Sequence, residues 1–261
     1  MVKFDKEFFF DELKRLNPNH SRFGRGFLGD KVYEYIICRG CPFDCSFCAA
    51  PLIKTWGEGK GWLGVPSSEK VVKKLKEDVE KYNLAGLAFH DDIFTFHSKW
   101  FLEFAKLYIK ELKLPYVCNL IVGTFNGPVF DALVESNCRI VNVGIESGNE
   151  YIRTKIANRK IKTEKIISDL TRLKKAGIVV NTNNMIGFPE ETFEQFMDTI
   201  NVNAMVGLAR SIASIYCPYP GTALYEKCRS GKLMEQNGND TVMERKQSRL
   251  HLPNFPKKKI E

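Results

Sequence analysis

Long hydrophobic runs are missing from this chain. No apolar stretch approaches the roughly 18 consecutive residues expected of a helix that crosses a membrane. The first residues also lack the apolar core of an export signal, because Lys3, Asp5, Lys6 and Glu7 already carry charge there. We therefore expect a soluble, cytoplasmic protein with no membrane partner.

Conventional catalytic groupings are missing as well. The chain has only four histidines, dispersed at His20, His90, His97 and His251. No His–Asp or Ser–His constellation stands out, which is consistent with a chemistry that needs no conventional general base.

Acidic residues are fewer than basic residues, and the formal net charge is +8. Such an excess could attract nucleic acid, an acidic carrier or an anionic substrate. The basic residues are spread along the chain, however, as is typical of solvated helix faces. The block Lys257–Lys259 is expected to be a frayed tail. The charge therefore gives nucleic acid only weak support as a partner.

Apolar, β-branched runs alternate with helical patterns along most of the chain. With 44% hydrophobic residues, the 261 residues can fill a substantial core. The β-branched runs predict strands at Val32–Cys38, Gly86–His90, Tyr116–Val122, Ile140–Ile145, Ile178–Ile186 and Ser211–Cys217. The other patterns predict a helix capped by serines from Ser67, and helices over Ser98–Leu112, Pro128–Ser136, Thr163–Ala176, Thr192–Val206 and Thr222–Ser230.

Strand–helix units in succession imply parallel strands with right-handed crossovers. We predict an α/β fold, a partial (β/α)6 barrel like an incomplete TIM barrel, over residues 31–230. A doubly wound open sheet would have the same periodicity. Residues 1–30 contain an amphipathic helix around Glu7–Leu16 and a Gly- and Arg-rich connector over Gly24–Gly29, while residues 231–261 form a polar extension or truncated tail.

Four of the eight cysteines fall within the stretch CRGCPFDCSFC, from Cys38 to Cys48. Without an export signal they should stay reduced, and cysteines that merely fill a core would not cluster in this way. Cys41, Cys45 and Cys48 have C-x3-C-x2-C spacing and follow the first strand, at the mouth where βα loops build active sites. Three thiolates at this spacing suit an iron–sulfur cluster and leave one iron open.

Zinc is the alternative occupant of these thiols. Structural zinc sites normally take four ligands in two paired knuckles, and no second C-x2-C or H-x3-H pair follows. Cys38 could be a fourth ligand, but it lies at the strand end before the loop turns, so we expect an accessory or packing role. We therefore favour iron–sulfur over zinc.

The stretch resembles the signature of radical S-adenosylmethionine (SAM) enzymes, including the aromatic Phe47 before the last cysteine. The resemblance covers roughly residues 31–230 and points to the branch whose members often carry a cobalamin-binding domain. It implies a [4Fe–4S] cluster on Cys41, Cys45 and Cys48, whose open iron is chelated by the amino and carboxylate groups of SAM. Cobalamin is possible, but no D-x-H-x-x-G pattern of its domain precedes the barrel.

Two later strand ends carry side chains that SAM would need. Asp91 and Asp92 suit an ammonium group or a divalent metal, and the resemblance places one of them on the methionine amino group. Asp92 could instead cap the next helix. After the fourth strand, Glu146 can accept from ribose hydroxyls and Ser147 can donate to a carboxylate. Arg153, Arg159 and Lys160 follow, and one of them could pair with the methionine carboxylate. Arg159 is our candidate, although each of the three taken singly is expected to be a solvated surface residue.

The fifth strand ends in Met185, Ile186 and Gly187, and the resemblance places their backbone against adenine, which glycine allows to approach closely. An arginine that often follows the third strand in this branch is absent between Cys118 and Gly123.

The implied activity is reductive cleavage of SAM to a 5′-deoxyadenosyl radical that abstracts hydrogen from a substrate. We expect a small metabolite that undergoes methyl transfer, cyclisation or rearrangement, and an electron donor such as a flavodoxin or ferredoxin. The alternatives are radical modification of RNA or protein, and a non-catalytic metal-binding module.

Overall fold

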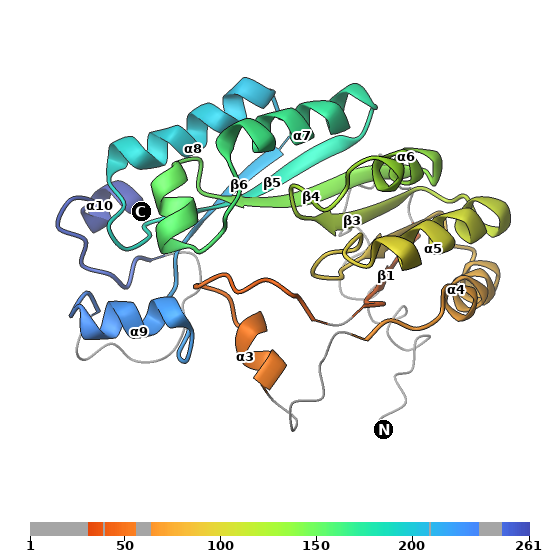
Figure 1. The fold of residues 1–261 in the computed structure, drawn as a ribbon, viewed down its shortest axis with the longest axis horizontal. Helices are drawn as coiled ribbons and strands as arrows, with labels where there is room; N and C mark the ends of the chain where they lie inside the picture. Colours follow the sequence, from red (N-terminus) through yellow and green to blue (C-terminus); the bar gives the residue numbers. More distant parts are fainter. Residues whose placement is uncertain (1–30, 39, 56–63, 209, 235–246) are drawn as a thin grey trace.

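The computed structural model describes residues 31–38, 40–55, 64–208, 210–234 and 247–261, in which strands and helices alternate (Figure 1). The strands are β1 (Val32–Tyr35), β2 (Gly86–Phe89), β3 (Tyr116–Leu120), β4 (Cys138–Glu146), β5 (Val179–Ile186) and β6 (Arg210–Ile215). The helices are α3 (Ala50–Thr55), α4 (Ser68–Tyr82), α5 (Ser98–Glu111), α6 (Pro128–Glu135), the π-helix η1 (Ile152–Ile156), α7 (Thr163–Lys175), α8 (Phe193–Val206), α9 (Ala223–Ser230) and α10 (Lys257–Ile260).

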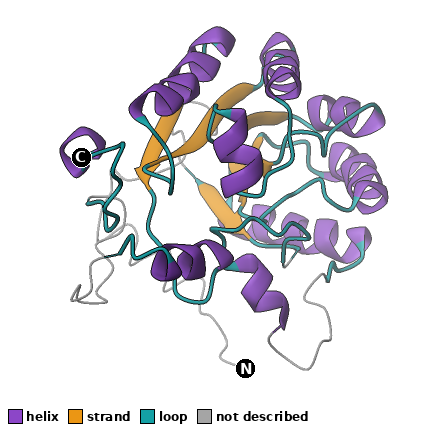
Figure 2. Ribbon diagram, turned by 60° about the vertical axis from the view of Figure 1, so that its left-hand side comes forward, coloured by secondary structure: helices purple, strands orange, loops and turns teal. Residues whose placement is uncertain are grey.

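The strands form one parallel sheet in the order β1-β2-β3-β4-β5-β6. Each strand pairs with its neighbours in sequence, and β1 and β6 are the edges, so the described sheet is open. Helices surround the outside of the curved sheet (Figure 2). The α/β prediction of a partial barrel is confirmed. The doubly wound alternative is wrong, because such a sheet reverses its strand order at a switch point.

The two faces of the sheet bury different layers. Val141 and Val143 of β4 belong to the large core between the sheet and the helices. Ala88, Val117 and Ile140, from three neighbouring strands, form a separate small cluster on the inner face. Because successive residues of a strand point to opposite faces, these two clusters assign the direction of the remaining side chains in β2, β3 and β4.

Local signals explain where the helices begin. Ser67 caps α4 with its side-chain oxygen, which accepts from the Lys70 amide, and Val71, Val72 and Leu75 bury one face of that helix. At α8, Thr192 and Gln195 form a reciprocal capping box. The helices predicted from Ser67 to Ser230 are therefore present, with ends that shift by a residue or so.

The first strand ends earlier than the predicted Val32–Cys38. The amides of Ile37 and Cys38 donate to the carboxylate of Asp91, which follows β2, and not to a neighbouring strand. The chain therefore leaves the sheet at Tyr35 and turns into the cysteine loop. The short helices α3 and η1 were not predicted, because neither has a long apolar period.

The end of the chain is more ordered than the predicted tail. Leu250, Phe255 and Ile260 are buried in a second hydrophobic cluster with Ile186 and other residues at the ends of β5 and β6. The whole lysine block lies in α10, where Lys259 Nζ lies 5.1 Å from the centre of the Phe193 ring. The block is therefore not frayed.

The predicted helix around Glu7–Leu16 and the connector Gly24–Gly29 lie outside the described residues. The division into residues 1–30, 31–230 and 231–261 stays a prediction.

Candidate active site

The loop of residues 41–48, which carries the three cysteines, follows β1 and is tied to two distant elements. The Ser46 amide donates to the carbonyl of Ala157 at 3.1 Å, just after η1. The Ser46 carbonyl accepts from the amide of Leu224, in the first turn of α9, at 2.8 Å. The loop is thus held across the mouth of the barrel by main-chain hydrogen bonds, which do not depend on a bound ligand.

The thiols of this loop are free and close enough to influence one another. Burial raises the pKa of Cys41, and nearby Asp92 and Cys48 raise it further. Burial also raises the pKa of Cys45 to about 11, although the Arg159 guanidinium opposes that shift. Within the described ranges, no three Cys, His, Asp or Glu side chains already stand as a metal-ligand set. The thiols would therefore have to reorient and release protons to bind a cluster.

The two aspartates after β2 have different surroundings. Asp91 is fully buried, and its carboxylate accepts from the amides of Ile37 and Cys38. Asp92 is exposed, with no hydrogen-bond partner among the described residues, and partial desolvation raises its pKa. The capping alternative for Asp92 is wrong, because α5 begins after His97. Of the predicted pair, Asp91 anchors the cysteine loop and Asp92 faces solvent.

Glu146 ends β4 in a strained conformation. Its φ of 67° is unusual for a residue with a side chain, and the register with β5 shifts between Gly144 and Glu146. The strain turns the carboxylate back over Gly144, where any added Cβ would collide with Glu146 Oε1. That oxygen pairs with Arg159 Nη1 at 3.0 Å. Burial raises the pKa of Glu146, and the arginine opposes this shift.

Arg159 keeps one donor free beside the cysteine loop. Its side chain is 7% exposed, yet Nη2 has no hydrogen-bond partner. It lines a hollow of about 280 Å³ together with Cys45, Ile121 and exposed Lys160. A buried guanidinium with an unused donor is well suited to bind a carboxylate. Cys45, Glu146 and Arg159, which the sequence predicts for three separate roles, therefore lie close together.

Ser147 has a structural role in this arrangement. It is fully buried, and its hydroxyl accepts from the Asn149 amide at 3.2 Å. Arg153, also fully buried, donates to the carbonyls of Ser147 and Gly148 at 2.8 and 3.0 Å, and to that of Ile161 at 2.9 Å. Arg153 thus joins the turn after Glu146 to the segment that follows Arg159. It is not exposed to a ligand.

The turn after β5 is organised by a buried glutamate. Gly187 has a φ of 84°, and its amide donates to Glu191 Oε2 at 2.6 Å, while the Phe188 amide donates at 3.2 Å. Burial raises the pKa of Glu191 to about 7, although both amides oppose the shift. Ile260 packs against Gly187, with a methyl carbon 3.3 Å from where a Cβ would stand.

The other predicted contacts of the nucleoside lie in the same cluster. Met185 is half-buried and Ile186 is buried, both at the end of β5. Phe47 packs against this cluster, with its ring centre 5.9 Å from that of Phe188. Sequence reasoning missed Glu191, Ser46 and the anchoring role of Arg153. A glutamate or arginine in a loop normally indicates an exposed side chain, so no signal marked them.

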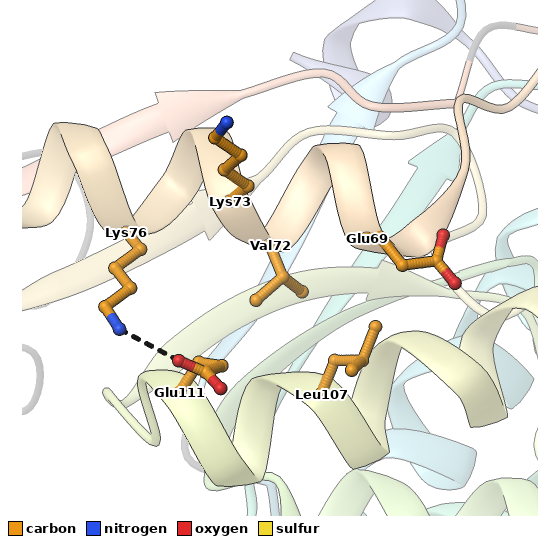
Figure 3. Close-up of a pocket in the computed structure, with 6 residues that line it drawn as sticks. All are labelled: Glu69, Val72, Lys73, Lys76, Leu107 and Glu111. Atoms are coloured by element: carbon orange, nitrogen blue, oxygen red, sulfur yellow. Dashed lines mark hydrogen bonds and ion pairs between the residues drawn. The ribbon is translucent and has the colours of Figure 1, made fainter.

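A second hollow, of about 310 Å³, lies far from these residues. It opens between α4 and α5 and is bridged by the ion pair of Lys76 Nζ with Glu111 Oε2 at 2.9 Å (Figure 3). Val72 of α4 and Leu107 of α5 point toward one another across it (Figure 3). The hollow lies in the outer layer of helices and shares no residue with the strand ends, so we do not assign the site there.

Comparison with known proteins gives a consistent result. The sequence model described as the radical SAM superfamily matches residues 35–202. An uncharacterized methyltransferase of Pyrococcus horikoshii is 33% identical over 198 residues, which are 75% of this chain and 42% of that protein. A bacteriochlorophyllide d C-8(2)-methyltransferase of Chlorobaculum tepidum is 26% identical over 79% of this chain and 46% of that protein.

A tRNA-2-methylthio-N(6)-dimethylallyladenosine synthase of Thermus thermophilus is 24% identical over 73% of this chain and 42% of that protein. Among solved structures, the radical S-adenosylmethionine methyltransferase TsrM of Kitasatospora setae, with cobalamin and a [4Fe–4S] cluster bound, superposes with a TM-score of 0.65. That match has 16% identity and covers 77% of this chain and 37% of the other. The chain spans less than half the length of these curated relatives.

The described part of the chain has no helix long and apolar enough to span a membrane.

Proposed function

Because the chain belongs to the radical SAM superfamily, we propose that Cys41, Cys45 and Cys48 hold the [4Fe–4S] cluster that this family uses with SAM. Three thiolates leave one iron for the methionine part of SAM. When bound, the cluster supplies the electron that breaks the C5′–S bond and yields a 5′-deoxyadenosyl radical. The observation that carries the proposal is the pair Glu146–Arg159 beside the Cys45 thiol.

The protein's own side chains orient SAM at this mouth. Asp92, exposed and electrostatically coupled to Cys41, is suited to the methionine ammonium group. The free Nη2 of Arg159 is suited to the carboxylate. Glu146 retains its second oxygen for ribose hydroxyls, while Arg159 keeps the first in place. Asp91 and Arg153 contribute by holding the loops that carry these groups.

The adenine would lie against the turn after β5. The amide of Gly187 is already engaged by Glu191, so this turn offers adenine a flat backbone surface and not a free donor. Met185 and Phe47 supply apolar surface on either side of that position. Ser147 is assigned no contact with SAM, because its hydroxyl is buried in the turn.

The radical would abstract hydrogen from a small metabolite that undergoes methyl transfer, cyclisation or rearrangement. Relatives named as methyltransferases favour the first of these. An electron donor such as a flavodoxin or ferredoxin would reduce the protein. If cobalamin takes part in methyl transfer, it would be held outside the described barrel.

Anaerobic reconstitution with iron and sulfide, followed by dithionite and SAM, tests the proposal. Wild-type protein should turn brown and release 5′-deoxyadenosine, measured by liquid chromatography with mass spectrometry. Cys41→Ala should lose nearly all of this product, because two thiolates hold the cluster poorly. Cys138→Ala is the matched control, since Cys138 starts β4 at the opposite end of the strand from the mouth. Zinc without iron, or equal product from Cys41→Ala, would contradict the proposal.

Modification of RNA is the second candidate, favoured by a relative named as a tRNA methylthio-adenosine synthase. The net charge of +8 is compatible with such a substrate. RNA binding that weakens steeply with salt would support this candidate over a neutral metabolite. Modification of a protein has no comparable support among the described features.

A further inference from the structure

A row of amide side chains crosses the inner face of the sheet below the strand ends. Asn119 of β3, Asn142 of β4 and Asn181 of β5 are register partners, and Arg210 of β6 follows in the same row. Neighbouring strands lie about 4.8 Å apart, so the row spans roughly 14 Å. Nothing in the proposed binding of SAM uses these side chains.

The direction of these side chains follows from their strand neighbours. Cys118 and Val141 lie in the outer core under the helices, so Asn119 and Asn142 point to the inner face. On β5, Thr182 is buried and bonds to Asn203 of α8 at 2.5 Å, which directs Asn181 inward as well. The small apolar cluster that includes Val117 and Ile140 lies one layer below the row. The amides therefore form a polar layer above an apolar floor.

The asparagines are hydrogen-bonded in one direction. Asn181 Nδ2 donates to Asn142 Oδ1 at 3.1 Å, and Asn142 Nδ2 donates to Asn119 Oδ1 at 3.2 Å. Asn119 Nδ2 donates to the main-chain carbonyl of Asp91 at 3.0 Å. The row is therefore fixed at one end to the residue whose carboxylate anchors the cysteine loop. Its amides are pre-oriented and cannot rotate without breaking this chain.

Each amide still has unused hydrogen-bonding capacity. A carboxamide carries two N–H donors and two acceptor lone pairs, and the row uses one donor of each side chain. The three asparagines are half-buried, and Asn181 Oδ1 accepts from none of the described residues. Exposed Arg210 has no described hydrogen-bond or ion-pair partner. The inner face thus presents a row of amide hydrogen-bond donors and acceptors, and the guanidinium of Arg210 stands at the β6 end of that row.

The row lies below the strand ends that carry the proposed SAM contacts. Gly144 lies two residues beyond Asn142 on the same inner face, and Glu146 with Arg159 lies above it. The hollow of about 280 Å³ beside Cys45 is lined by Ile121, two residues beyond Asn119. The proposed SAM site therefore lies above the row, on the same side of the sheet.

We propose that the asparagine row binds a nucleotide, with the edge of the base on the amides and the phosphate toward Arg210. This inference rests on the proposed function in one respect, because the nucleotide would be the substrate from which the radical abstracts hydrogen. Asparagine amides pair well with the hydrogen-bonding edges of bases, and an arginine suits a phosphate. A flat apolar macrocycle would instead cover half-buried amides without satisfying them, which is unfavourable.

Binding of uridine monophosphate (UMP), measured by calorimetry under anaerobic conditions with saturating SAM, tests the inference. UMP has no adenine, so it does not compete for the turn at Gly187. Asn142→Leu and Asn181→Leu should weaken UMP binding roughly tenfold or more. Arg210→Ala should weaken UMP and leave uridine unchanged. Asn201→Leu, at an exposed position of α8 without a described partner, is the matched control and should bind as wild type.

A change in the ligand avoids any doubt about the folding of variants. On wild-type protein, 3-methyluridine monophosphate lacks the N3–H donor and should bind roughly tenfold more weakly than UMP. A hairpin RNA with a uridine-containing loop separates the two sources of the same chemistry. Tight binding of the hairpin with weak binding of UMP indicates RNA, whereas comparable binding indicates a free nucleotide.

Failure of this inference differs from failure of the proposed function. Protein that makes 5′-deoxyadenosine but binds neither UMP nor the hairpin contradicts the nucleotide site alone. Equal binding of UMP and its 3-methyl derivative, or UMP binding that the asparagine variants do not change, also overturns it. Protein that binds UMP through these residues but cleaves no SAM contradicts the radical chemistry alone.

Discussion

At the scale of single residues, two buried carboxylates hold main-chain amides beside the candidate site. Asp91 accepts from Ile37 and Cys38, and Glu191 accepts from Gly187 and Phe188. Each carboxylate fixes the path of a loop at a strand end, where the backbone has left the ladder. Burial raises the pKa of both, because desolvation outweighs the hydrogen bonds.

The pH dependence of stability should reveal Glu191. In the folded protein, Glu191 keeps its proton until about pH 7, whereas in the unfolded chain it loses the proton near the ordinary glutamate pKa of 4.5. The folded state binds more protons in this interval, so the free energy of unfolding should fall as pH rises, by up to roughly 3 kcal/mol. Glu191→Gln should remove the Glu191 contribution and so make the fall shallower in urea titrations of the apoprotein at several pH values, while the raised pKa values of Asp91 and Glu146 leave a smaller fall.

The neighbouring glutamate is a matched control for that measurement. Glu190 is exposed and pairs with Lys227 at 2.6 Å, and this interaction lowers its pKa. Glu190→Gln should therefore leave the fall between pH 4.5 and 7 in place. An unchanged slope in Glu191→Gln would show that the buried carboxylate is ionised throughout.

At the scale of elements, the end of β4 depends on close contact with α8. Gly148 donates its amide to Thr199 Oγ1 at 2.8 Å. A Cβ at Gly148 would meet the carbonyl of Asp198 and lie 2.5 Å from the Thr199 Cα, both in the helix backbone. Only glycine allows this approach, which holds the turn after Glu146 against the helix.

Gly148→Ala should therefore push α8 away from β4. We expect a loss of about 1–3 kcal/mol in the free energy of unfolding, typical of overpacking, and a raised KM for SAM through displacement of Glu146. Gly64→Ala is the control, because a Cβ there would meet nothing within 4 Å. Equal stability of the two variants, measured by urea unfolding, would mean that the contact with α8 is not tight.

At the scale of the whole molecule, the barrel has two main hydrophobic clusters. The larger lies between β1 to β5 and the surrounding helices. The second lies at the ends of β5 and β6 and includes Leu250, Phe255 and Ile260. Residues 247–261 thus support the turn that carries Gly187, and stability of the second cluster is coupled to the nucleoside side of the site.

Phe255→Ala should test this coupling. The side chain is fully buried, so its loss should cost about 3–5 kcal/mol. It should also raise the KM for SAM several-fold, because Ile260 would no longer be held against Gly187. Leu133→Ala, fully buried in the larger cluster, should lower the melting temperature while leaving that KM unchanged. A similar KM in both variants would separate residues 247–261 from the site.

The sequence alone determined the order and type of the six strands and of the longer helices between them, and the loop of residues 41–48. Periodicity reports local preferences, and those preferences survive in β2, α5 and α8 with small shifts at their ends. The spacing of Cys41, Cys45 and Cys48 is also local, because one short loop contains all three ligands. Such features need no knowledge of which strands are neighbours.

Only the tertiary structure decided the partners across the sheet. The sequence offered Asp91 and Asp92 as equals, and the fold buried one against the cysteine loop and left the other exposed. The row of Asn119, Asn142 and Asn181 depends on strand register, which is set by hydrogen bonds between segments far apart in sequence. A local pattern contains no record of that register, so the polar layer of the inner face emerges only when the strands are aligned.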